Sequence, residues 1–528
     1  MARSFRQCAA STAAIVQAEW MPSTPPDPGG ATTPLAMPLP EWLAISLVVG
    51  ASAAVLVLEI LAARLLAPYV GVSLETYTGI IGTVLGGIAV GAWLGGAAAD
   101  RLDPRRLLPV LLVTGGALAV ATIPIVRALG PAAGSTGAIG ILVVTAAGFL
   151  PSAAVLSAIP PAVVKLQLRD LHTTGTTVGQ LSAFGTIGAI AATFLTGFVL
   201  VAIAAVTTLI AGVGVVLVLA GLALWWSMPS TRRAMTAEMT SMSLLAGVAL
   251  LGAVALGSPC DTQTEYYCVT IRADDDRPSG RTLVLDDLRH SYVDLDDPTH
   301  LEFWYVRRIV DAIEELGTSG PIDIVHVGGG AMTVPAYVQS TRPGSEQIVL
   351  EIDEELVDVV TAEFARATGP GTGIEVVVGD GRLSLRDLPD DSADVVVGDA
   401  FGSRSVPWHL ATTEFVEEVD RVLRPGGIYV ANVIDGPQQR FLSSYAATIA
   451  TRFEHVGVVL GESAALGGNG NSVIVASHVP FEVGALERRR AAAGDAGRFV
   501  DEIDDFIDEG LVLTDDFAPV DQLLAGTR

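Results

Sequence analysis

Seven long apolar segments fill the first half of this chain, between Trp42 and Gly257. An apolar run of about 18 residues or more can cross the roughly 30 Å core of a bilayer as a helix. The fifth and sixth segments form one apolar stretch from Ala183 to Trp226, which is too long for a single crossing and must turn back near residues 205–207. We expect helices at residues 43–63, 77–99, 107–127, 138–162, 181–203, 208–227 and 241–257. A transmembrane bundle of about seven helices is therefore predicted for residues 41–257.

Basic residues are unevenly divided between the loops of this bundle. One set of loops holds Arg101, Arg105, Arg106, Lys165, Arg169, Arg232 and Arg233, whereas the opposite set holds only Arg64 and Arg127. Because Lys and Arg mark the cytoplasmic side, the N-terminus is expected inside the cell. Seven crossings predict a multi-pass cell membrane protein. Because their number is odd, the C-terminal domain is expected on the extracytoplasmic side.

Glycines recur in the second predicted helix, at residues 86, 87, 91, 95 and 96. Small residues allow helix backbones to approach closely within a membrane. This pattern predicts tight helix packing, and we do not interpret it as a transport signature.

The remaining composition limits the partners of the protein. Residues 1–40 are rich in Ser, Pro, Thr and Ala, and we expect a disordered tail there. The net charge of −26 comes mostly from the second half, so nucleic acid is not an expected partner, whereas the lipid bilayer is. The acidic surface has two interpretations, a solvated domain or an attractor of cationic substrates.

Two of the three cysteines, Cys260 and Cys268, flank a short segment just beyond the seventh apolar run. A disulfide there would require an oxidising compartment, and two unpaired thiols in a linker are the alternative. No metal site is predicted, because no further Cys and no close His completes a ligand set.

Strand-like runs alternate with helical segments in the second half. They lie at residues 322–327, 347–352, 374–378, 393–397, 427–433, 456–460 and 472–476. This spacing predicts a mostly parallel sheet covered by helices on both faces. Ligands of such sheets bind beyond the carboxyl ends of the strands.

Chemically active residue types follow the first four of these strands. Gly328-Gly329-Gly330 follows the first, Glu351 ends the second, Asp380 follows the third and Asp399 follows the fourth. An acid ending the second strand commonly accepts hydrogen bonds from ribose hydroxyls. Each acid alone is more often a strand-end cap, but three at successive strand ends after a glycine loop indicate a nucleoside site.

From about Arg281 to Leu524 the chain resembles spermidine synthases, the aminopropyltransferase branch of the class I methyltransferase fold. The resemblance is carried by Leu285-Asp286-Asp287 with His290, Gly328 to Gly330, Glu351-Ile352-Asp353, Gly379-Asp380-Gly381, Asp399 and Arg424-Pro425-Gly426-Gly427. The whole chain is similar to bacterial proteins that join a multispanning bundle to such a domain. The resemblance implies a linker and small β segment at residues 258–320 and a Rossmann-like α/β domain at residues 321–528.

This resemblance also implies a reaction. Decarboxylated S-adenosylmethionine would lie over Gly328 and Gly330, with Glu351 on the ribose and Asp380 at the adenine. Asp399 would orient or deprotonate an amine, which attacks the carbon next to the sulfonium and releases methylthioadenosine. The implied residues are Asp399 for catalysis; His290, Gly328, Gly330, Glu351, Asp380 and Gly381 for the nucleoside; and His300 and Asp516 for the amine substrate.

Several residues depart from the family pattern. Spermidine synthases usually carry an acid where this chain has Ala331, and a second acid where it has Gly402 and Ser403. His290 stands where a glutamine is typical. A doubly charged diamine needs carboxylates at both ends, so the acceptor is left open.

Three functions remain open at this level: aminopropyl transfer; methyl transfer from intact S-adenosylmethionine; and a transporter or sensor with an inactive nucleoside-binding domain. An extracytoplasmic domain also conflicts with a cytosolic donor. Either the last helix does not cross, or the bundle supplies the donor, or the function has changed. The sequence also leaves a homo-oligomer open.

Overall fold

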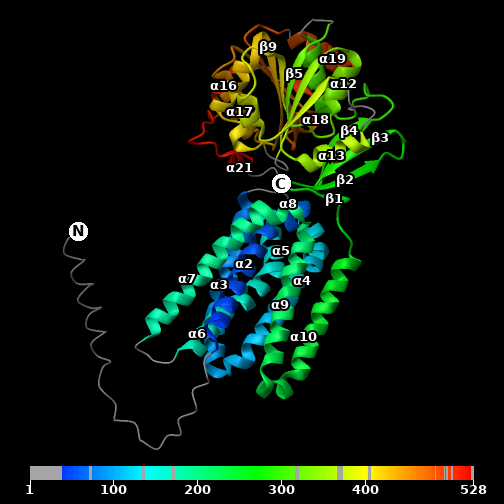
Figure 1. The fold of residues 1–528 in the computed structure, drawn as a ribbon. Helices are drawn as coiled ribbons and strands as arrows, with labels where there is room; N and C mark the ends of the chain where they lie inside the picture. The colour runs from blue at the N-terminus through cyan, green and yellow to red at the C-terminus, as the bar shows by residue number, and fades with distance from the viewer. Residues whose placement is uncertain are drawn as a thin grey trace, which may run out of the picture. The chain divides into compact units, whose positions relative to one another are not determined.

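The computed structural model describes residues 39–70, 74–133, 137–168, 173–315, 320–364, 373–401, 406–481, 483–492, 494, 497–500 and 503–524. The expected tail up to residue 38, Arg169 and the Gly402-Ser403 pair lie outside the described residues. Figure 1 shows a helical bundle followed along the chain by an α/β domain.

The bundle consists of α2 (Glu41–Val70), α3 (Leu74–Arg101), α4 (Pro104–Ala133), α5 (Gly137–Ser157), α6 (Ile159–Gln167), α7 (Thr174–Leu195), the π-helix η2 (Thr196–Leu200), α8 (Val201–Ile203), α9 (Val206–Ser227) and α10 (Pro229–Ala255). Within the described ranges, six helical segments are long and apolar enough to cross a membrane. The predicted reversal near residues 205–207 is confirmed, because α8 ends at Ile203 and Ala204 is extended before α9 begins.

The seventh predicted helix differs from the other six. It is the apolar end, Met239–Ala255, of a longer helix that begins at Pro229, and it is shorter than the six long segments. The prediction from hydropathy missed the first part of α10, because that part is polar. That part is helical because Ala, Met, Arg and Glu all favour helix.

The fourth predicted helix is divided in two. A turn at Ala158 separates α5 from α6, and Pro160 and Pro161 follow directly in the first turn of α6. Proline has no N–H to donate, so it is tolerated at the start of a helix and interrupts one elsewhere.

Glycines on α3 bring this helix into close contact with α5. A Cβ added at Gly91 would lie 2.0 Å from the carbonyl oxygen of Ala154, and one at Gly87 would lie 2.9 Å from the Cβ of Ala153. An added Cβ at Gly95 would lie 2.5 Å from the Cα of Ala158, the residue between α5 and α6. The tight packing predicted from these glycines is confirmed.

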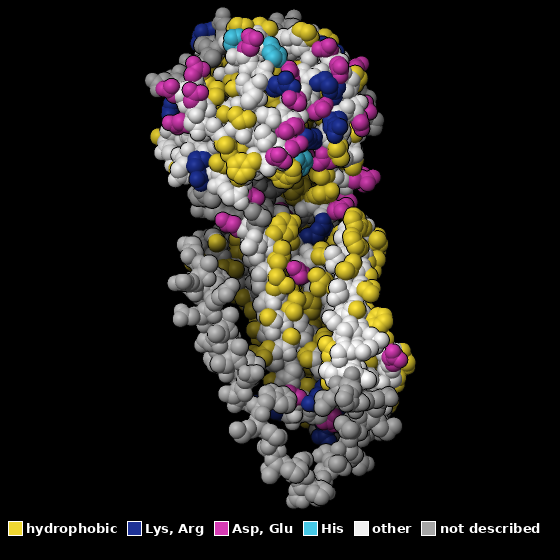
Figure 2. Space-filling model, turned by 90° about the vertical axis from the view of Figure 1, so that its left-hand side faces the viewer, with side chains coloured by type: hydrophobic (Ala, Val, Ile, Leu, Met, Phe, Trp, Pro, Cys, Tyr) yellow, Lys and Arg dark blue, Asp and Glu magenta, His cyan; other side chains and the backbone are white. Residues whose placement is uncertain are grey.

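The surface of the bundle is apolar. Large hydrophobic side chains such as Trp93, Phe198 and Leu251 are more than 70 % exposed, at 74 %, 77 % and 71 %. In Figure 2 hydrophobic side chains cover much of the bundle, whereas charged side chains of both signs cover the α/β domain. Apolar surface of this extent is typical of a face that contacts lipid or another protein.

The α/β domain comprises β1 (Thr262–Gln263), β2 (Cys268–Ala273), β3 (Gly280–Leu285), β4 (Leu288–Asp294), α11 (Trp304–Glu315), β5 (Asp323–Val327), α12 (Thr333–Thr341), β6 (Glu346–Glu351), α13 (Glu354–Glu363), β7 (Ile374–Val378), α15 (Gly381–Arg386), β8 (Ala393–Gly398), η3 (Trp408–Leu410), α16 (Thr413–Val422), β9 (Leu423–Asp435), α17 (Arg440–Ala450), β10 (His455–Leu460), α18 (Glu462–Ala465), β11 (Gly470–Ser477), α19 (Val483–Ala492), β12 (Arg498–Phe499), α20 (Ile503–Asp508) and α21 (Val520–Leu523).

The main sheet has eight strands in the order β12-β10-β11-β9-β8-β5-β6-β7. Strands β9, β8, β5, β6 and β7 are parallel, while β11, β10 and β12 run antiparallel at one end. All seven predicted strands form, and the two-residue β12 adds an eighth. Separate apolar clusters bury the two faces, one against α16 and α17 and the other against α11 and α12. The central strands are therefore rich in Val and Ile.

The small sheet β1-β2-β3-β4 is antiparallel and lies within the expected β segment. Its β3–β4 hairpin turns at Asp286, which has a φ of 55°. The buried side chains of Leu283 and Leu285 pack in one cluster with Ala331 and Met332. This packing holds β4, which carries His290, beside the loop that follows β5.

Candidate active site

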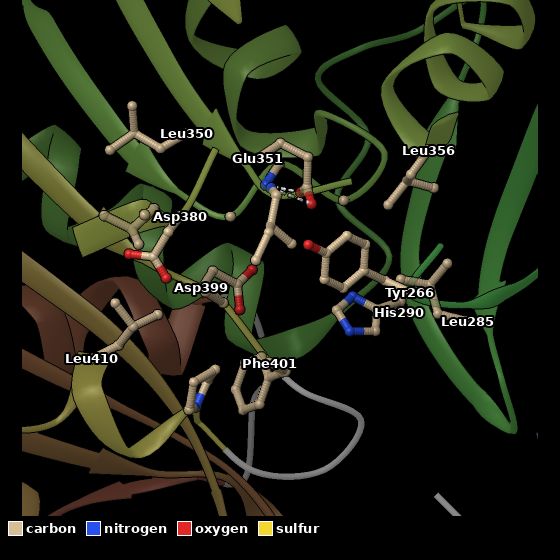
Figure 3. Close-up of a pocket in the computed structure, with 18 of the residues that line it drawn as sticks. Tyr266, Leu285, His290, Leu350, Glu351, Leu356, Asp380, Asp399, Phe401 and Leu410 are labelled. Atoms are coloured by element: carbon tan, nitrogen blue, oxygen red, sulfur yellow. Dashed lines mark hydrogen bonds between the residues drawn. The ribbon is translucent and has the colours of Figure 1, made fainter. Parts of the chain in front are cut away.

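A cavity of about 240 Å³ opens at the carboxyl ends of the adjacent strands β8, β5, β6 and β7. Of the nine nucleoside, amine and catalytic residues named from the sequence, seven line it: His290, Gly328, Gly330, Glu351, Asp380, Gly381 and Asp399. Figure 3 shows Asp399 between Asp380 on one side and His290 with Tyr266 on the other. The predicted gathering of residues at the strand ends is thus present.

The glycine loop after β5 is required by close backbone approaches. Gly328 has a φ of +96°, and a Cβ there would lie 2.5 Å from the carbonyl oxygen of Asp399. Gly330 has a φ of +49°, and its added Cβ would lie 2.5 Å from Ser291 Oγ. A side chain at either position would be strained and would displace its neighbour. The loop therefore presents bare backbone to the cavity.

Glu351 is buried at the end of β6, with 7 % of its surface exposed. The Gly329 N–H donates to its Oε2 at 2.9 Å, and the N–H groups of Ile352 and Asp353 donate to its Oε1 at 3.0 and 3.2 Å. Burial raises the pKa of Glu351, and the bonds from Gly329 and Asp353 oppose this rise. A carboxylate accepts about four hydrogen bonds, so roughly one acceptor position remains for a ligand.

Asp380 caps the N-terminus of α15. Its Oδ1 accepts the N–H groups of Arg382 and Leu383, both at 3.0 Å. Its Oδ2 lies 2.9 Å from Nε2 of His409, which also lines the cavity. Asp380 therefore acts as the N-cap of α15, as strand-end acids commonly do. One lone pair of its Oδ2 remains for a ligand.

Asp399 follows β8 and faces the cavity. Asn432 on β9 donates from Nδ2 to Asp399 Oδ1 at 2.8 Å, and Asn471 on β11 donates to Asn432 Oδ1 at 3.0 Å. Burial raises the pKa of Asp399 to about 7, although the bond from Asn432 lowers it. This carboxyl can gain or lose a proton near neutral pH, which suits a general base.

His290 and aromatic side chains form the other wall. Burial lowers the pKa of His290 to about 4, so its ring is neutral at pH 7. This ring meets Phe401 edge-on, with ring centroids 6.3 Å apart, and Tyr305 donates to the His290 carbonyl at 3.0 Å. The Tyr267 hydroxyl donates to the Phe401 carbonyl at 2.8 Å, which ties the small sheet to the segment after β8.

The two remaining predicted site residues, His300 and Asp516, do not line the cavity. His300 packs edge-on against the Tyr292 ring, with its Nε2 3.5 Å from Glu302. Asp516 lies in the turn closed by the Thr514–Phe517 bridge. The geometry of this cavity gives neither residue a place beside an amine substrate.

Cys260 and Cys268 form a disulfide, with their Cα atoms 5.5 Å apart, where β2 begins. Among the described residues, no group of three or more His, Cys, Asp or Glu side chains is placed to hold a metal ion.

Further polar residues of the site were not predicted, among them His409, Asn432 and Asn471. Asn432 gave a detectable signal, because it is a single amide within the apolar run of β9. His409 gave none, since it reaches Asp380 only through the fold of η3.

The chain is similar to known proteins over part of its length. Residues 325–431 match the family described as "Methyltransferase domain". The polyamine aminopropyltransferase of Chromobacterium violaceum is 26 % identical over 218 residues, 41 % of this chain and 80 % of that protein. The one from Vibrio vulnificus is 26 % identical over 236 residues, covering 42 % and 75 %.

Among solved structures, a probable spermidine synthase from Corynebacterium glutamicum is 27 % identical, covers 49 % of this chain and 97 % of its own, and has a TM-score of 0.46. At this modest identity, the sequence matches to the polyamine aminopropyltransferases support a member of the spermidine synthase family.

Proposed function

We propose that the protein is a membrane-anchored, spermidine synthase-like transferase that moves an aminopropyl group from decarboxylated S-adenosylmethionine to an amine. The observation that carries this proposal is the position of Asp399. Its carboxyl, with a pKa near 7, faces the same cavity as the bare glycine loop and Glu351.

The donor fits the acceptors that the cavity leaves free. Gly328 and Gly330 line the cavity without side chains, so their backbone can lie close to a ligand. Glu351 has about one acceptor position left for a ribose hydroxyl, and Asp380 has one for the adenine amino group. His409 holds the Asp380 carboxylate in place for that contact.

In the reaction, the amine nitrogen attacks the carbon next to the sulfonium. The new C–N bond forms as the C–S bond breaks, and the electron pair of that bond leaves with the sulfur of methylthioadenosine. Asp399 accepts the proton that the new secondary ammonium must lose. Because only the ionised carboxyl can do this, activity rises as the pH passes upward through the pKa of Asp399.

One observation favours a second candidate, methyl transfer from intact S-adenosylmethionine. Ala331 is fully buried in an apolar cluster, so no acid follows the glycines to receive the amino end of an aminopropyl group. The match to a methyltransferase family agrees with this alternative.

A donor panel separates these functions. The purified full-length protein is incubated with S-adenosylmethionine or its decarboxylated form and a set of amines, and products are identified by mass spectrometry. Aminopropyl transfer releases methylthioadenosine, whereas methyl transfer releases S-adenosylhomocysteine. Binding without turnover of either donor would favour a sensor and contradict the proposal.

The apolar helices anchor the domain at the membrane, and we place the α/β domain outside the cell. The bias of basic loops and the Cys260–Cys268 disulfide support this side. It requires that α10 cross the bilayer and that the donor be delivered across it. Protease added to intact spheroplasts should remove the domain, and thiol labelling should leave both cysteines unmodified. A protected domain with two free thiols would place it in the cytosol.

A further inference from the structure

We propose that the acceptor is a monoamine with an apolar body, rather than a diamine. This inference rests on the proposed aminopropyl transfer and specifies the substrate class of the same cavity. The arrangement of charged groups in the cavity carries it.

Three acids line the cavity among the described residues, and two of them are engaged. Glu351 accepts three backbone N–H groups, and Asp380 accepts two N–H groups and the His409 contact. Asp399 differs, because Asn432 bonds only its Oδ1. Its Oδ2 is the carboxylate oxygen available to an ammonium group.

Within the described part of the chain, no acid beyond these three lines the cavity. Asp515, near the C-terminus, does not supply a free carboxylate to the cavity. Both of its carboxylate oxygens accept hydrogen bonds from Arg382, at 2.7 and 2.8 Å, and neither residue lines the cavity.

The surroundings of Asp399 are suited to an apolar body. Phe401, Pro407 and Leu410 line the same cavity as Asp399, and so does the neutral ring of His290. Figure 3 shows Asp399 between Leu410 and His290. Burying an alkyl group against these side chains is favourable. Burying a second ammonium there, without a carboxylate, is costly. The aromatic rings offer only a weaker cation–π contact.

Two amines with the same four-carbon body test this inference. The full-length protein, saturated with methylthioadenosine, is titrated with n-butylamine and with 1,4-diaminobutane by ligand-observed NMR. We expect butylamine to bind at least tenfold more tightly. Equal or tighter binding of the diamine overturns the inference, as does the absence of binding by both amines while methylthioadenosine binds. Failure of methylthioadenosine itself to bind would instead overturn the proposed function.

A variant that restores a second charge provides the complementary test. His290→Glu places a carboxylate across the cavity from Asp399 and should shift the preference at least tenfold toward the diamine. His290→Gln, a neutral control of similar size, should keep the preference for butylamine. If both variants, each still binding methylthioadenosine, show the same preference, the charge argument is wrong.

Discussion

Asn432 lowers the pKa of Asp399, and its replacement by leucine should move the pH dependence of the reaction. The variant removes the 2.8 Å bond to Asp399 Oδ1, which favours the ionised carboxyl. A hydrogen bond to a charged group contributes about 1.5–3 kcal/mol, and about 1.4 kcal/mol corresponds to one pKa unit. The pKa of Asp399 should therefore rise from about 7 to about 8–9.

The sign follows from the role of a base. Activity requires the ionised carboxyl, so it is lost as the pH falls through the folded pKa, and a higher pKa moves that loss to higher pH. At pH 7 the variant should be about 5- to 50-fold slower, and near pH 10 most of the difference should vanish.

The assay is methylthioadenosine release at saturating donor and acceptor between pH 6 and pH 10. Ionisation of the amine affects both proteins equally, so the difference between their profiles reports Asp399. Ser472→Ala on β11 is the control, because its buried hydroxyl has no hydrogen-bond partner among the described residues. An unshifted midpoint, or a uniform loss at every pH, would refute this reasoning.

Three further predictions concern binding and stability. Glu351→Ala should weaken methylthioadenosine binding by about 1.5–3 kcal/mol in calorimetry, whereas Glu346→Ala, on the exposed start of the same strand, should not; equal effects would remove the ribose role. Gly328→Ala should abolish that binding through its clash with the Asp399 carbonyl, while Gly467→Ala, which has a similar positive φ but open space, should leave binding intact; a binding-competent Gly328→Ala would contradict the loop argument. Asp399→Asn should stabilise the protein by up to about 4 kcal/mol at pH 8 and little at pH 4. The reason is that a carboxyl whose pKa is raised on folding destabilises the folded state as the pH rises from about 4 to about 7. Unfolding midpoints in detergent that do not depend on pH in this way would exclude the raised pKa.

The fold was largely predictable because its signals are local. Hydropathy located the six long helical segments, and alternating apolar runs located all seven longer strands of the main sheet. The helix boundaries were predicted wrongly where the hydropathy of a segment does not report whether its backbone is helical. The start of α10 is helical but polar, and the break at Ala158 depends on two prolines inside an apolar run.

The site was partly predictable for the same reason. Strand ends in a parallel sheet converge, so Glu351, Asp380 and Asp399 could be brought together from their spacing alone. Contacts from distant segments could not. His409 and Asn471 reach the site only through the folded chain.

Single-turnover release of methylthioadenosine from decarboxylated S-adenosylmethionine shows whether Asp399 acts as a base in aminopropyl transfer. The wild type and Asp399→Asn are compared at saturating donor, with the amine that the panel identifies. We expect a rate about 10²- to 10⁴-fold lower in the variant, as for loss of a general base, with unchanged donor affinity. An equal rate in both proteins, or no release by the wild type with any amine, would contradict it.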